Sequence, residues 1–228
     1  MVNSELATFA KFNLAFMKIF ILLAIAMIFL SINNGCKSSS NSSSSCDAGC
    51  PKDTIKFSDN NHPLKPYVYV SVKDCKADTA IWSYSGLGKN RKLELPAVQL
   101  TKDLVHCIIN DTSNAWLLFN DCSTQRGFYL KVTFTKVSGR INPNAINNLD
   151  KKFAVREGLV AYTDKGNLFV EDMSTGKQAM MTFGEQLDFD FDAIHKTLDS
   201  VNITPSRIWA KVKLKERWKE LEKSITLE

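Results

Sequence analysis

The sequence has few of the residues that mark loop-dominated or fibrous chains. Only 10 glycines and 6 prolines occur among 228 residues, which excludes collagen-like and Gly/Pro-rich low-complexity proteins. Hydrophobic residues make up 44% and charged residues 23%, as in an ordinary globular protein, which excludes a disordered chain and a multi-span membrane protein. The length allows one domain or two small ones.

Motifs of common catalytic and nucleotide-binding sites are also missing. No Gly-x-Ser-x-Gly nucleophile elbow, Walker loop or Gly-x-Gly-x-x-Gly run occurs. His106 and Cys107 are adjacent, but neighbours on a strand point to opposite faces, so they do not form a Cys–His couple with each other. The net charge of +5 comes from interleaved signs, which is typical of a solvated surface. We therefore expect no catalytic residue, cofactor, metal or nucleic-acid partner.

An apolar run at residues 19–30 follows Lys18 and precedes the small and polar residues 31–35. A positive residue, an apolar stretch of about 7–15 residues and small residues before a cleavage point are the pattern of a secretory signal. The run is shorter than the roughly 20 residues of a membrane-spanning helix. Met17 is a second candidate start, because residues 17–36 alone form a compact signal.

The end of this segment, Gly35-Cys36, resembles the bacterial lipoprotein signal, in which Gly or Ala precedes an invariant Cys. The resemblance implies that the Cys36 thiol receives a diacylglyceryl group, with palmitate as a typical further chain. It also implies that signal peptidase II removes residues 1–35. Asn33 departs from the pattern, since lipoproteins usually have Leu there. An ordinary secreted protein and a retained single-pass anchor remain alternatives.

The residues after Cys36 fit a lipid-anchored protein of the bacterial cell envelope, expected in the outer membrane and facing the periplasm or the surface. Residues 37–45 are nearly all serine and have no apolar face to bury, which indicates a flexible tether. The expected organisation is a signal peptide at 1–35, lipidated Cys and tether at 36–52, and a globular domain at 53–228.

The remaining cysteines are candidates for disulfides, because export leads to an oxidising compartment. If Cys36 carries lipid, an odd number is left, so at least one stays free or pairs elsewhere. We expect one bridge within the group Cys46, Cys50 and Cys75, and one between Cys107 and Cys122. Zinc binding by the first group is an alternative, although the second close pair of a structural zinc site is missing.

Alternation of apolar and polar residues predicts strands in the body of the chain. The predicted strands are 67–72, 79–84, 104–109, 115–119 and 128–137. In the last of these, Phe128, Leu130, Val132 and Phe134 share the face opposite Tyr129, Lys131, Thr133 and Thr135.

A further meander is predicted at 159–163, 167–171 and 177–183, with Gly-containing turns between the strands. This segment loosely resembles one blade of a β-propeller, but no second copy recurs at a fixed period. We therefore predict a mainly β domain, an antiparallel meander or sandwich, with one or two short helices.

Helices are expected at 143–151, where Pro143 takes the first helical position, and at 190–200. The second is favoured by the spacing of Phe191, Ile194, Leu198 and Val201. For residues 208–227 a terminal hairpin is favoured over a helix, because the preceding strands offer a partner.

Asp188, Asp190 and Asp192 alternate along residues 187–193 and share one face of an extended segment. We expect them to cap the following helix or to face solvent. Calcium binding and acid catalysis are the alternatives. The aromatic residues Trp82, Trp116, Trp209, Trp218, Tyr67 and Tyr69 lie in strand patterns and are expected mainly in the core, with some available to line a carbohydrate- or peptide-binding face.

These features favour a non-catalytic binding or scaffolding module that is held at a membrane by the lipid on Cys36, with an envelope protein or polysaccharide as partner. One alternative is an envelope hydrolase whose carboxylates, Asp188 and Asp190, converge in space. Another is a structural subunit of an outer-membrane complex. A pocket of acids with raised pKa values would favour the hydrolase, and an aromatic groove without them the binder.

Overall fold

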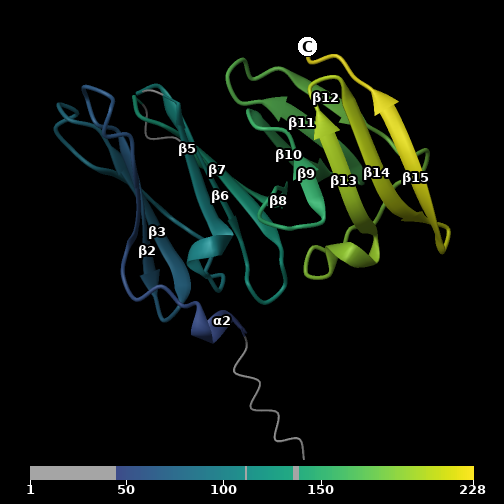
Figure 1. Ribbon diagram of the computed structural model, residues 1–228, viewed down its shortest axis with the longest axis horizontal. Coiled ribbons are helices and arrows are strands. Elements are labelled where there is room, and N and C mark those ends of the chain that lie inside the picture. The colour runs from purple at the N-terminus through teal and green to yellow at the C-terminus, as the bar shows by residue number, and fades with distance from the viewer. Residues whose placement is uncertain (1–44, 111, 136–138) are drawn as a thin grey trace, which may run out of the picture. The chain divides into compact units, whose positions relative to one another are not determined.

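The computed structural model describes residues 45–110, 112–135 and 139–228 (Figure 1). This part of the chain is mainly β, with antiparallel sheets in a sandwich-like arrangement, which confirms the predicted fold class. Within the described residues, helical structure is limited to α2 (Ser45–Ala48) and two 3-10 turns, Lys102–Leu104 and Ile194–Lys196. None of the described helices is both long and apolar enough to cross a membrane. The signal, Cys36 and most of the expected tether lie outside the described residues.

The first sheet has the order β1-β2-β3-β4. Its strands are β1 (Ile55–Ser58), β2 (Tyr67–Lys73), β3 (Lys76–Ser83) and β4 (Arg91–Glu94). Strands β2 and β3 confirm the strands predicted at 67–72 and 79–84. Asp74 and Cys75 form the turn between β2 and β3. Both have positive φ, as a two-residue type I′ hairpin turn requires.

The second sheet has the order β12-β11-β10-β8-β7-β6-β5. Its strands in chain order are β5 (Val105–Asn110), β6 (Asn114–Asn120), β7 (Gly127–Thr133), β8 (Gly139–Ile146), β10 (Leu159–Asp164), β11 (Asn167–Asp172) and β12 (Gln178–Met181). The predicted meander is confirmed as β10, β11 and β12.

The third sheet has the order β15-β14-β13-β9 and contains a parallel pair, β9 with β13. Its strands are β9 (Phe153–Val155), β13 (Leu198–Thr204), β14 (Arg207–Leu214) and β15 (Arg217–Ser224). The antiparallel pair β14–β15 confirms the terminal hairpin.

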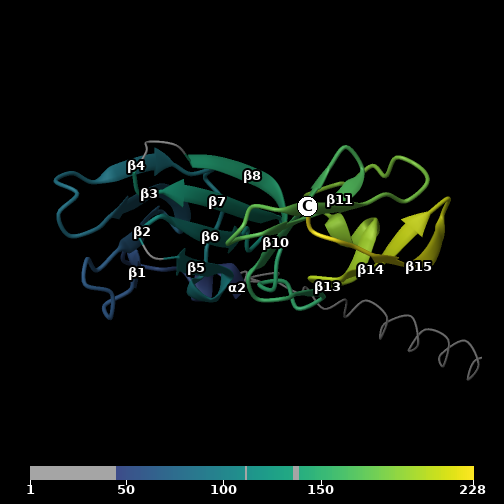
Figure 2. The same ribbon diagram turned by 90° about the horizontal axis from the view of Figure 1, so that it is seen from above.

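The first and third sheets, the two outer sheets, each pack on the seven-stranded sheet (Figure 2). The first sheet shares a core with β5, β6 and β7, in which Phe128, Leu130, Val132 and Phe134 are buried, as the alternation predicted. The third sheet shares a second core with β10, β11 and β12. The alternate residues of β6, β7 and β10 point to the opposite face and form a smaller cluster, which contains Trp116, Tyr129 and Val160. This face carries the candidate site.

The helix predicted at 143–151 is wrong. Residues 139–146 form β8, which pairs with β7 on one side and with β10 on the other. Pro143 lies where the β7–β8 register shifts between Gly127 and Tyr129, a bulge at which a missing N–H is tolerated. Tertiary pairing therefore overrides the local helix signal.

The helix predicted at 190–200 is also largely wrong, because only the 3-10 turn forms and β13 begins at Leu198. Ile194, Leu198 and Val201 are buried in the second core, so their spacing reflects packing against β9 and β14.

Disulfides join Cys46 to Cys122 and Cys50 to Cys75, and Cys107 is free. The second bridge lies within the expected group, but the expected Cys107–Cys122 pair is wrong. Cys107 packs on the first core from β5, whereas Cys122 follows β6 and bonds to the segment at α2. Since all three sulfurs of the zinc alternative are in disulfides, none is a thiolate ligand. Cys46 and Cys50 fall in the expected tether, and their bridges attach them to the folded body.

Candidate ligand-binding site

A cavity of about 400 Å³ opens on the seven-stranded sheet at the face that the outer sheets leave uncovered. Strands β6, β7, β8, β10, β11 and β12 contribute to it. Its lining combines aromatic rings, amides and charges of both signs: Trp116, Tyr129, Tyr162, Asn142, Asn144, Gln178, Lys131, Arg140, Asp164 and Glu171.

A row of aromatic rings runs across this face, one ring from each of four strands. The centroids of Trp116 and Tyr129 lie 5.7 Å apart, and those of Tyr129 and Tyr162 lie 5.8 Å apart. Phe169 continues the row, stacked on Tyr162 at 5.3 Å. These separations are typical of favourable aromatic pairs, so the rings hold one another in place. Three rings of the row, those of Trp116, Tyr129 and Tyr162, line the cavity as a wall.

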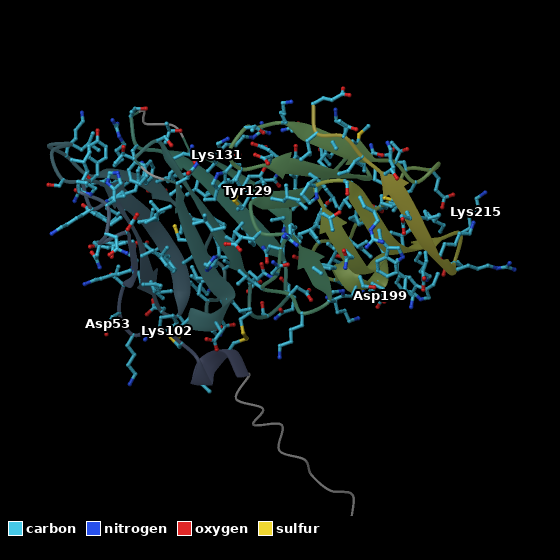
Figure 3. The ribbon with its side chains drawn as sticks, turned by 45° about the horizontal axis from the view of Figure 1, so that its top comes forward. Asp53, Lys102, Tyr129, Lys131, Asp199 and Lys215 are labelled. Carbon is cyan, nitrogen blue, oxygen red and sulfur yellow. A yellow bond between two sulfur atoms is a disulfide. The ribbon has the colours of Figure 1, made fainter. Side chains whose placement is uncertain are left out.

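Lys131 lines the cavity, and it is labelled together with Tyr129 in Figure 3. Its Nζ lies 3.2 Å from Glu171 Oε1 and 4.5 Å from the centroid of the Trp116 ring. Gln178 Nε2 donates to the other carboxylate oxygen of Glu171 at 3.1 Å. The Glu171 side chain is only 12% exposed, so this ion pair is better shielded from water than a typical surface pair. Lys131 thus covers Trp116 while it neutralises Glu171.

The two phenols of the cavity stay protonated. Burial raises the pKa of Tyr129 to about 12, although a hydrogen bond from Asn142 acts in the opposite direction. Burial also raises the pKa of Tyr162. Both hydroxyls can therefore donate a hydrogen bond to a ligand at neutral pH.

Hydrogen bonds shift the pKa of several acids in the described part of the chain. The acids whose pKa is shifted there are Asp78, Asp172 and Asp199, and in each the pKa is lowered by hydrogen bonds to the carboxylate. None of the three lines the cavity. The cavity thus has the aromatic character expected of a binder, and these three acids lie outside it.

Trp116 contributes an unpaired polar group to this site. Its side chain is 1% exposed, and its Nε1–H has no acceptor among the described residues. A buried donor without a partner costs about 1–3 kcal/mol. Such a group is therefore a sign of a missing partner at this place.

The structure does not bring Asp188, Asp190 and Asp192 to the cavity. All three are exposed on one side of an extended segment, while Leu187 and Phe189 on the other side are buried. Asp190 pairs with Lys196 at 3.7 Å, and Asp192 with Arg126 at 3.6 Å. The expected helix capping does not occur, because the 3-10 turn at Ile194 has no side-chain cap. In the described residues no three His, Cys, Asp or Glu side chains are arranged to hold a metal ion.

His195 and Asp150 form a close pair elsewhere, with Nε2 2.7 Å from Oδ2. The other ring nitrogen of His195 lies 3.3 Å from the Leu198 carbonyl oxygen. Both nitrogens are thus engaged in joining the turn before β9 to the start of β13. We interpret the pair as a structural link.

Sequence reasoning did not single out Tyr129, Lys131, Tyr162 and Glu171 as a site. The sequence did contain an indication of these residues, because each lies on the face of its strand opposite the buried apolar residues. What was missing was the strand order, which places β7 two positions from β10 with β8 between them.

No protein-family model matches this chain, and no curated protein sequence matches it.

Proposed function

We propose that this protein is a lipid-anchored, non-catalytic binding module of the bacterial cell envelope and that the cavity at Trp116, Tyr129 and Tyr162 is its ligand site. The observation that carries the proposal is a pocket walled by the aromatic rings of Trp116, Tyr129 and Tyr162, in which the half-buried Glu171 is paired with Lys131 at 3.2 Å. Such pockets, with a few convergent polar groups, are where ligands bind.

The anchoring part of the proposal rests on the sequence of residues 19–36, which resembles a lipoprotein signal. Two acyl chains hold a protein at a membrane far more firmly than one. The membrane is therefore one partner, through Cys36, and the cavity serves a second, an envelope protein or polysaccharide.

Metabolic labelling with an alkyne analogue of palmitate tests the anchor. We expect the wild type to incorporate label and Cys36→Ala to lose it. Cys107→Ala is the matched control, since Cys107 is the free thiol of the described residues and should not affect labelling. Label that persists in Cys36→Ala, or a mature N-terminus upstream of Cys36, would contradict the anchor.

The hydrolase alternative receives less support. Asp188 and Asp190 are exposed and do not converge in a pocket. The structural-subunit alternative predicts a large apolar patch, whereas the large exposed hydrophobic residues in the described chain, Leu64, Met180 and Trp218, lie on different sheets or loops. Pull-down from detergent-solubilised membranes with wild type and Arg140→Ala tests the binding role. A partner lost only in the variant supports the cavity as the site, and one retained equally by both contradicts it.

A further inference from the structure

We propose that the cavity binds an uncharged saccharide of one or two rings, an inference that rests on the proposed binding function and names its ligand class. The cavity volume of about 400 Å³ lies in the range of small-ligand pockets, roughly 300–1,000 Å³.

The position of the cavity argues against an extended peptide. Peptides that bind a sheet as an added strand need an open edge with unpaired backbone groups. The cavity lies mainly over the interior strands β6, β7, β8, β10 and β11 of the seven-stranded sheet. The edge strand β12 contributes Gln178, whose backbone N–H and carbonyl are already bonded to Glu228. β8 is flanked by β7 and β10, although it pairs with β10 only at Ala145–Tyr162 and Ile146–Ala161, so a peptide would have to insert between two strands and could not simply add at an outer edge.

Those side chains match hydroxyl groups. Asn142, Asn144 and Gln178 carry amides, which both donate and accept, as each sugar hydroxyl does. The protonated phenols of Tyr129 and Tyr162 do the same. The aromatic row supplies the apolar surface on which the C–H face of a sugar ring packs.

The charges of the lining favour a neutral ligand. Lys131 and Arg140 are balanced by Asp164 and Glu171, so no excess of either sign selects an ion. Lys131 and Glu171 already neutralise each other at 3.2 Å. Arg140 and Asp164 are exposed and make no ion pair within the described part of the chain. Each can hydrogen-bond a hydroxyl at the mouth of the cavity with the extra strength of a charged partner.

Trp116 supplies the second, independent observation. Its buried Nε1–H lacks an acceptor, and the Lys131 ammonium group covers its ring at 4.5 Å. A saccharide that packs beside Lys131, with the Lys131–Glu171 pair intact, would bring hydroxyl oxygens and a ring face to this side of the indole. Binding should therefore change the fluorescence of Trp116.

The test uses full-length protein purified in detergent and a glycan array of neutral hexose and N-acetylhexosamine oligosaccharides, with uronic-acid oligosaccharides and peptides as comparison probes. We expect binding to at least one neutral saccharide, and a change in tryptophan emission when that saccharide is titrated in solution. Trp116→Phe should abolish the emission change.

Gln178→Ala and Arg140→Ala should each weaken binding about tenfold, since both side chains are exposed and their loss leaves the cores intact. Tyr67→Phe is the matched control, because Tyr67 lies on β2, in the first sheet, outside the cavity. Failure of every neutral saccharide, or equal binding by Gln178→Ala and the wild type, overturns the inference. Capture only of a peptide or an acidic saccharide through Arg140 also overturns it, but leaves the proposed binding function standing.

Discussion

The Cys46–Cys122 disulfide should be the larger covalent contribution to the stability of the folded body. It closes a loop with a sequence separation of 76 residues, whereas Cys50–Cys75 closes one of 25. In the chain-entropy model a bridge stabilises a protein because it restricts the unfolded chain, by about 4.5 kcal/mol for the longer loop and about 3.5 kcal/mol for the shorter one.

The two loops are nested, which reduces the first value. With Cys50–Cys75 intact, the unfolded chain between Cys46 and Cys122 is effectively shortened by the inner loop to about 51 residues, and the expected contribution falls to about 4 kcal/mol. The double variant Cys46→Ala/Cys122→Ala should lower the free energy of unfolding by this amount, within a typical total of 5–15 kcal/mol.

Urea unfolding followed by circular dichroism measures the loss, provided that the slope against urea is compared as well. Cys107→Ala is the matched control: it removes a thiol that forms no disulfide and should cost less than the double variant. A loss below about 1 kcal/mol with an unchanged slope would refute the loop-closure reasoning. Peptide mapping that finds Cys46 bonded to another cysteine would refute the pairing itself.

Three further changes probe the fold. Thr163→Val should raise the free energy of unfolding by about 1 kcal/mol, because the buried Thr163 hydroxyl has no partner among the described residues; thermal unfolding checks this, and a lower melting temperature would contradict it. Gly127→Ala should cost about 3 kcal/mol or more, since its Cβ would lie 2.3 Å from the Ala145 carbonyl oxygen at the β7–β8 bulge; urea unfolding that matches the wild type would exclude this close approach. Hydrogen bonds from Ser174 lower the pKa of Asp172 to about 2. The contribution of Asp172 to the free energy of unfolding is therefore full above about pH 4 and is lost as the pH falls toward 2. Asp172→Asn should flatten the acid dependence of stability in this range, and an unchanged profile would contradict the assignment.

The sequence predicted the strands best where each strand has one buried face. On β7, alternation identified both faces correctly, because the period of a strand determines which side chains share a side. Residues 143–151 were misread, because Pro143 is as compatible with a bulge as with a helix start, and only pairing with β7 and β10 decides between them. The spacing of Ile194, Leu198 and Val201 likewise suits a helix and a turn followed by a strand.

The candidate site could not be predicted, because it depends on distances across strands that are far apart in sequence. Lys131 and Glu171 are 40 residues apart, and their contact follows from the strand order of the seven-stranded sheet. The disulfide prediction was partly wrong for the same reason, since sequence spacing alone does not show that Cys122 lies next to Cys46.

The Cys46–Cys122 bond also sets how far the body can stand from a membrane. If Cys36 carries the lipid, the flexible tether ends at Cys46 and not near residue 52, because the Cys46–Cys122 disulfide bonds Cys46 to the folded domain. About ten residues span at most about 35 Å when fully extended. The folded domain would then stay within this distance of the lipid leaflet. Reduction of the Cys46–Cys122 bond would lengthen the tether, and the lipid would still hold the protein at the membrane.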